Sequence, residues 1–338
     1  MFGSRKRRDA GRATAGVDLQ LVWEYANDEV VEAVEEQIGA GPEASPVMAV
    51  YDVAREALRA GDLGATRLVF TGDFVRSVIE RESRVGQGFT LQRGSGIVAA
   101  KTMPPTADGV VDILVPLYLV LTGEAGDQRF SLDVVRHTAA HEAVHATIHH
   151  LGSKPFAVHL RHRLAYAEEQ FAQMAAEQVE EHLAEYQADL VVPRAHSTPG
   201  DLEAVTEAWL HTIGAELPGL DQSDPGYVDQ SMRVCLGALH VLWKALACFA
   251  AELRRGDVFD APAAEIVASP GWQRDVAPWW DEYLRLLGQV PMTYDVDIPR
   301  TDAVVKSMGV HLQTWAYGLG FDFHDTEQGG RFRITLWD

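Results

Sequence analysis

The sequence from residue 137 to residue 150 reads His137-Thr-Ala-Ala-His141-Glu142-Ala-Val-His145-Ala-Thr-Ile-His149-His150. It holds five of the chain's 13 histidines and contains the pattern H-E-x-x-H at residues 141–145. We predict one helix from Asp133 to His150, because Gly152 follows it and glycine commonly follows the last turn of a helix.

On such a helix, residues i and i+4 lie one above the other, so His141 and His145 can bind one metal ion. Glu142, beside the first histidine, is placed to act as a general base toward a water whose pKa the metal lowers toward neutrality. The alternative is an exposed helix face that carries polar side chains. We interpret His137 and His149, which extend the i+4 series, as flanking structural residues.

A second predicted helix, over residues 164–192, supplies a candidate third ligand. A catalytic zinc usually binds three protein ligands and a water, and Glu185 is our choice for the third. Asp189, one turn later, can accept the N–H of a ligand histidine and fix which ring nitrogen binds the metal. The alternatives for the third ligand are Glu181, His182 and Asp189 itself.

An H-E-x-x-H helix followed by E-x-x-x-D on a later helix resembles the gluzincin branch of zinc metallopeptidases. The run Glu185-Tyr-Gln-Ala-Asp-Leu-Val-Val-Pro193 is similar to the E-x-x-A-N/D…L-L-x-P ending of ImmA/IrrE-like peptidases, intracellular proteases that cut regulatory proteins. A strand followed by Arg129-Phe-Ser-Leu132 resembles the lead-in of the same family, so the resemblance covers about residues 110–193. It implies a zincin-like catalytic core and a Zn²⁺ cofactor.

The predicted function is therefore that of a zinc-dependent endopeptidase, with Glu142 as general base and a protein or peptide substrate. Such a substrate commonly docks as an added strand, which the run 110–121 or a neighbouring strand can receive. Zincins also use a histidine or tyrosine to stabilise the oxyanion. The candidates for that role are His196, His211, Tyr227 and His240.

Two other functions fit the same residues. Two histidines and a carboxylate also form the metal site of non-haem Fe(II) oxygenases, in which Glu142 has no obligatory role as a base. The third function is that of a catalytically silent, metal-stabilised sensor or interaction module, with the helical region after residue 200 available to a partner.

Charge and composition limit the classes of partner that the protein is expected to bind. The 338 residues include 29 basic and 49 acidic side chains, and the net charge of −20 disfavours binding to nucleic acid and to anionic membranes. The run 113–121 is far shorter than the roughly 20 apolar residues that span a bilayer. Two cysteines, Cys235 and Cys248, are typical of buried thiols in a reducing compartment, so we predict a cytoplasmic protein. The oligomeric state stays open.

The order of the patterns predicts an α+β fold, with strands early in the chain and helices late. We predict a disordered basic tail over residues 1–16, a zincin-like metallopeptidase domain with a small β-sheet over 17–197, and a mainly helical region over 198–338. The further predicted helices cover residues 18–38, 46–60, 73–83, 201–213, 227–255, 272–287 and 301–319, and the predicted strands cover 67–70, 110–121 and 331–337.

Overall fold

The computed structural model of the chain describes residues 8–9, 19–41, 45–58, 65–82, 92–93, 96–97, 99–121, 131–151, 156–193, 197–294, 297–327 and 329–335. The predicted tail over 1–16 lies outside these ranges except for Arg8 and Asp9, as do residues 129 and 130 of the lead-in. The prediction of an α+β fold is confirmed, because a mixed sheet with helices is followed by a mostly helical region.

The chain forms two compact units. The first comprises Met1–Arg93, Ile97–Lys154 and Gln187–Ala195, and the second comprises Gly94–Gly96, Pro155–Tyr186 and His196–Asp338. Helix α6 (Tyr166–Val191) is continuous, so it begins in the second unit and ends in the first.

The first unit is built on a five-stranded sheet with the order β1-β2-β3-β7-β6. The three central strands are parallel, and a short antiparallel strand lies at each edge. Their bounds are β1 (Arg8–Asp9), β2 (Leu19–Glu24), β3 (Thr66–Thr71), β7 (Val111–Pro116) and β6 (Lys101–Thr102). All six residues of β7 are buried, as is usual for a strand with both faces covered.

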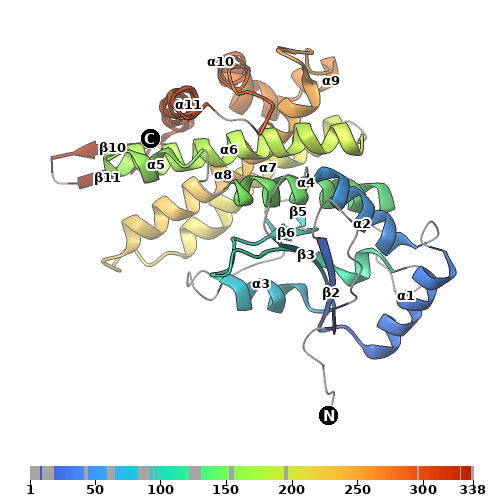
Figure 1. The fold of residues 1–338 in the computed structure, drawn as a ribbon. Helices are drawn as coiled ribbons and strands as arrows, with labels where there is room; N and C mark the ends of the chain where they lie inside the picture. The colour runs from blue at the N-terminus through green and yellow to red at the C-terminus, as the bar shows by residue number, and fades with distance from the viewer. Residues whose placement is uncertain are drawn as a thin grey trace. The chain divides into compact units, whose positions relative to one another are not determined.

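The two faces of this sheet are covered by different helices (Figure 1). Residues of α3 (Phe74–Glu82) pack with Val22, Val69 and Leu114 on one face. Thr102 pairs with Ile113 on the opposite face, where its side chain meets α4 (Leu132–His150). Helix α2 (Pro46–Ala57) packs against α4, and α1 (Asp28–Ala40) precedes it. The H-E-x-x-H helix is thus seated on the sheet.

The predicted helix over residues 18–38 is wrong in its first part. Residues Leu19–Glu24 form the buried strand β2, and α1 begins only after Asn27, whose side chain accepts the backbone N–H of Glu29. A short apolar run fits a buried strand as well as a helix, so periodicity alone does not separate the two. The predicted strand 110–121 also ends early, at Pro116, and continues as a 3-10 turn at Leu117–Leu119.

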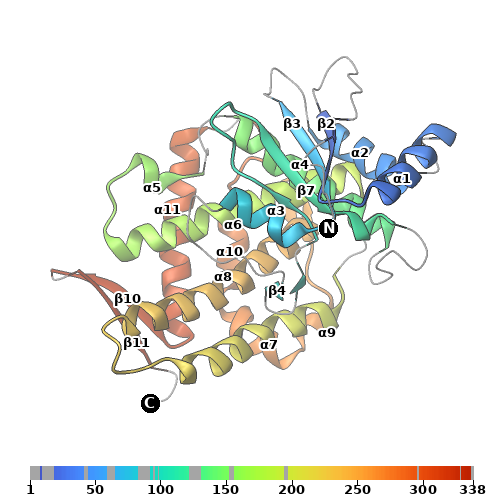
Figure 2. The ribbon, with the colours of Figure 1, turned by 90° about the horizontal axis from the view of Figure 1, so that it is seen from below.

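The second unit is helical, and Figure 2 shows α7 and α8 lying side by side within it. Its helices are α5 (Val158–Arg161), most of α6, α7 (Pro199–Glu216), α8 (Tyr227–Leu253), α9 (Ala264–Val267), a π-helical turn at Trp272–Val276, α10 (Ala277–Leu287) and α11 (Ile298–Gly318). The predicted strand 331–337 corresponds to β11 (Gly329–Ile334), which pairs with β10 (Phe321–Thr326). Two further strand pairs are β4 (Gln92–Arg93) with β5 (Gly96–Ile97), and β8 (Arg254–Arg255) with β9 (Val258–Phe259).

Helix α8 carries much of the core of the second unit. Trp243 from α8 packs against Trp315 from α11, with their ring centroids 5.9 Å apart. By length and composition α8 is apolar enough to cross a membrane, but 61% of that window is buried within the protein. Its two cysteines are free thiols, of which Cys235 is buried, and burial raises the pKa of that thiol to about 12.

Candidate metal centre

Helix α4 places two histidines of the motif side by side. Ser131 caps the helix by accepting the backbone N–H of Val134, and the following residues stay helical to His150. The Nε2 atoms of His141 and His145 lie 3.1 Å apart. Two nitrogens bound at 2.0–2.1 Å to one tetrahedral zinc lie about 3.3 Å apart, so this separation fits a shared ion.

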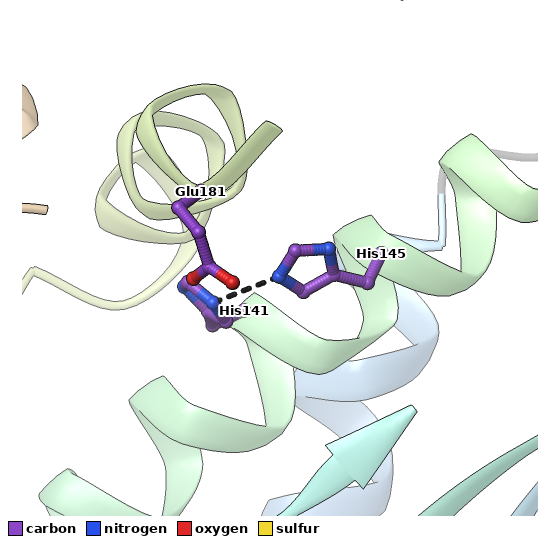
Figure 3. A group of neighbouring side chains, drawn as sticks. All are labelled: His141, His145 and Glu181. Carbon is purple, nitrogen blue, oxygen red and sulfur yellow. Dashed lines mark hydrogen bonds between the residues drawn. The ribbon is translucent and has the colours of Figure 1, made fainter. Parts of the chain in front are cut away.

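A carboxylate from α6 completes the group. Glu181 lies with His141 and His145 so that one ligand atom from each is within 4.8 Å of the others. Figure 3 shows the carboxylate of Glu181 directed toward the two imidazole rings. Two imidazole nitrogens and a carboxylate oxygen form a donor set that zinc and iron both accept. These three residues form a candidate metal-binding group.

Helix α8 adds a lysine and a histidine side chain along α6. Lys244 Nζ lies 2.5 Å from Glu181 Oε1, and His240 Nε2 lies 2.9 Å from Glu177 Oε2. Although burial alone raises the pKa of Glu177, the contact with His240 lowers it to about 2. The sequence analysis missed Lys244, because the pairing depends on how α6 and α8 are aligned, which a single sequence does not reveal.

The glutamate of the motif contacts the edge strand. The backbone N–H of Thr102 in β6 donates to Glu142 Oε2 at 2.5 Å, and Thr102 Oγ1 donates to the Glu142 carbonyl oxygen at 2.6 Å. The next N–H, that of Met103, donates to Asp112 in β7, so the N–H of Thr102 points away from β7, toward the open edge. The carboxylate of Glu142, the residue after His141, is therefore held at the sheet edge.

Glu185 and Asp189 lie in a second group of side chains. They meet His137, again with one ligand atom from each residue within 4.8 Å of the others. The structure thus brings Glu181, one of the alternatives, to the two motif histidines. The role of Glu185 as the third ligand, and that of Asp189 as a partner of a ligand histidine, stay predictions.

His182, another alternative for the third ligand, is buried in the core of the second unit and bonded there. Its Nδ1 contacts the carbonyl oxygen of Ala247 at 3.0 Å, and its Nε2 accepts a hydrogen bond from Arg254 Nη1 at 3.1 Å. Burial, helped by the charge of Arg254, lowers the pKa of His182 to about 3. Both ring nitrogens have protein partners, so we assign His182 a structural role.

This histidine makes stability depend on pH. The pKa of His182 is about 3 in the folded protein and about 6.5 in the unfolded chain, so its contribution is complete above pH 6.5 and is lost as the pH falls. We expect His182 to contribute a slope of up to roughly 1.4 kcal/mol of unfolding free energy per pH unit in this window. Urea unfolding at pH 8 and pH 5.5 measures it, with His182→Gln as the non-titrating control. Equal pH dependence in both proteins would contradict the assignment.

The candidates for stabilising the oxyanion lie on different parts of the chain. His240 pairs with Glu177, one turn of α6 before Glu181. His211 is exposed on α7, Tyr227 begins α8, and His196 lies outside the described residues. His150, at the end of α4, is half-buried, and its Nε2 lies 2.8 Å from Thr66 Oγ1.

Replacing Glu181 tests its place in the group. We expect Glu181→Gln to weaken zinc binding by more than about 100-fold, since loss of an outer partner alone costs 10–100-fold. Glu177→Gln is the matched control, because Glu177 lies one turn earlier and pairs with His240. Competition against a chromophoric chelator measures both affinities. Equal affinities in the two variants would remove Glu181 from the site.

In comparisons with protein families, with curated proteins and with solved structures, nothing matches this chain.

Proposed function

We propose that the chain is a zinc-dependent endopeptidase in which His141, His145 and Glu181 hold the metal. The observation that carries this proposal is the convergence of these three side chains, with Glu142 following His141 on the same helix. A metal group alone fits many functions. An acidic side chain that follows the first histidine adds the proton acceptor that hydrolysis requires.

When bound, the zinc polarises a substrate carbonyl and makes water a better nucleophile. Glu142 accepts the proton of the attacking water and passes it to the leaving amine. The hydrogen bond from the N–H of Thr102 supports this role, because it fixes the position of the Glu142 carboxylate. The second bond of Thr102, to the Glu142 carbonyl oxygen, anchors this turn of α4 to the edge strand.

A peptide substrate is supported by the same edge. Strand β7 lies inside the sheet, between β3 and β6, so among the described strands β6 supplies the edge at which a peptide can add, beside Thr102, whose own N–H is bonded to Glu142. The net charge of −20 favours a basic or neutral segment and disfavours nucleic acid and anionic membranes. The two free cysteines support a reducing, cytoplasmic location.

The test is cleavage of a library of proteome-derived peptides by zinc-loaded protein, with products read by mass spectrometry. We expect cleavage that chelation removes and that zinc restores. Glu142→Gln at full zinc occupancy serves as the control, and cleavage that chelation does not remove would come from a contaminating protease. No cleavage beyond that of the control would count against a peptidase of broad specificity, and the library would then be replaced by a cell lysate.

A further inference from the structure

A second group of metal-ligand side chains lies one helical turn away from the first. His137 precedes His141 by four residues on α4, and Glu185 follows Glu181 by four residues on α6. With Asp189, these residues bring one imidazole nitrogen and two carboxylate oxygens within 4.8 Å of one another.

The surroundings of His137 suit a ligand. The residue is only 3% exposed, and its Nδ1 lies 2.9 Å from the carbonyl oxygen of Val192. A carbonyl oxygen only accepts, so the ring donates from Nδ1 and its other nitrogen, Nε2, is the one that could bind a metal. Metal-binding histidines usually donate their second ring N–H to a carbonyl or carboxylate in this way.

The carboxylates belong to a row along α6. Glu177, Glu181, Glu185 and Asp189 follow one another at intervals of four residues, and like charges at this spacing repel. His240 and Lys244 lie 2.9 and 2.5 Å from the first two. The last two converge on His137, and Glu185 is only 2% exposed. A divalent cation bound among these three residues would interact with both carboxylates and with one ring nitrogen of His137.

We propose that His137, Glu185 and Asp189 form a second divalent-cation site, separate from the candidate centre at His141, His145 and Glu181. An imidazole nitrogen with two carboxylate oxygens is a donor set for zinc. The site would tie α4 to the last turns of α6, so its expected role is to fix these helices. It requires no peptidase activity, and the proposed function can fail while this site stands.

Without a metal, the same residues would form an ion pair. His137 Nδ1 lies 3.6 Å from Asp189 Oδ1, which a protonated histidine and an aspartate alone would explain. The count of bound ions separates the two descriptions. An ion pair adds no zinc, whereas the proposed site adds one zinc per chain to the one at the first centre.

The experiment titrates zinc into full-length, metal-stripped protein without a histidine tag, in competition with a chromophoric chelator. We expect two zinc ions per chain in the unaltered protein, one in His137→Gln, one in His141→Gln, and none in the double variant. His162→Gln is the matched control, since His162 also pairs with an aspartate, Asp302 at 2.7 Å, and should leave two. Circular dichroism confirms the fold of each variant, and Glu185→Gln replaces His137→Gln if the latter unfolds.

Three results would overturn the proposal. The first is one zinc per chain in the unaltered protein. The second is an unchanged count in both His137→Gln and Glu185→Gln, which leaves an ion pair only. The third is a double variant, Glu185→Gln with His141→Gln, that still binds one zinc. Both changes would then remove the same ion, and Glu185 would belong to the first centre.

Discussion

Glu142→Gln is expected to lower the rate of peptide cleavage by about 10²–10⁴-fold, the usual contribution of a general base. The amide is nearly the same size as the carboxylate but does not take up a proton from water. Its oxygen can still accept the N–H of Thr102, which lies 2.5 Å from Glu142 Oε2. The variant should therefore keep its fold and its zinc while it loses turnover.

The measurement is kcat on a peptide found in the library, with zinc content determined on the same sample. Thr102→Ser is the matched control, because serine keeps both the backbone N–H and a hydroxyl donor. Cleavage by zinc-loaded Glu142→Gln within about threefold of the unaltered protein would exclude Glu142 as the base. Iron in place of zinc, with oxygen-dependent turnover that survives this change, would instead favour an oxygenase.

Asp112→Ala is expected to lower the unfolding free energy of the first unit by about 3–5 kcal/mol, the usual cost of removing one partner of a buried ion pair. The buried Asp112 carboxylate accepts from Arg67 Nε at 2.5 Å and from Arg81 Nε at 2.7 Å. Burial alone lowers the pKa of Arg81, but the charges of Asp112 and Glu24 outweigh it and raise the pKa. Without Asp112, two largely buried guanidinium groups lose a shared partner.

The same residue holds the edge strand through its backbone, because its carbonyl oxygen accepts the N–H of Met103 at 2.8 Å. Urea unfolding followed by circular dichroism measures the loss of stability. Asp133→Ala is the control, since Asp133 pairs with Arg136 at the surface with its side chain 82% exposed, and should cost less than about 1 kcal/mol. A similar cost for the two variants would mean that the Asp112 network adds little.

The sequence predicted the helices of the candidate centre closely. The expected helices over residues 133–150 and 164–192 correspond to Leu132–His150 and Tyr166–Val191. The predictions depend on local signals, namely Gly152 after the first helix and Pro193 after the second, and the structure adds the cap of α4 by Ser131. His141 and His145 share a helix face for the same reason, since four residues make about one turn.

The carboxylate that meets these histidines depends on a longer-range property. Glu181, Glu185 and Asp189 all lie on one face of α6, so helical periodicity does not choose among them. The choice depends on how far α6 is shifted along α4, which packing decides. The contact between Thr102 and Glu142 likewise joins residues 40 positions apart. Strand β2 is stabilised by pairing with β3, and this pairing is not visible in the sequence of β2 alone.

Elemental analysis tests whether His141, His145 and Glu181 bind a metal ion. The protein would be purified without chelator or histidine tag, beside His141→Ala prepared in the same way. We expect the unaltered protein to carry one more zinc per chain than the variant. The same metal content in both proteins, or no metal in either, would contradict this expectation.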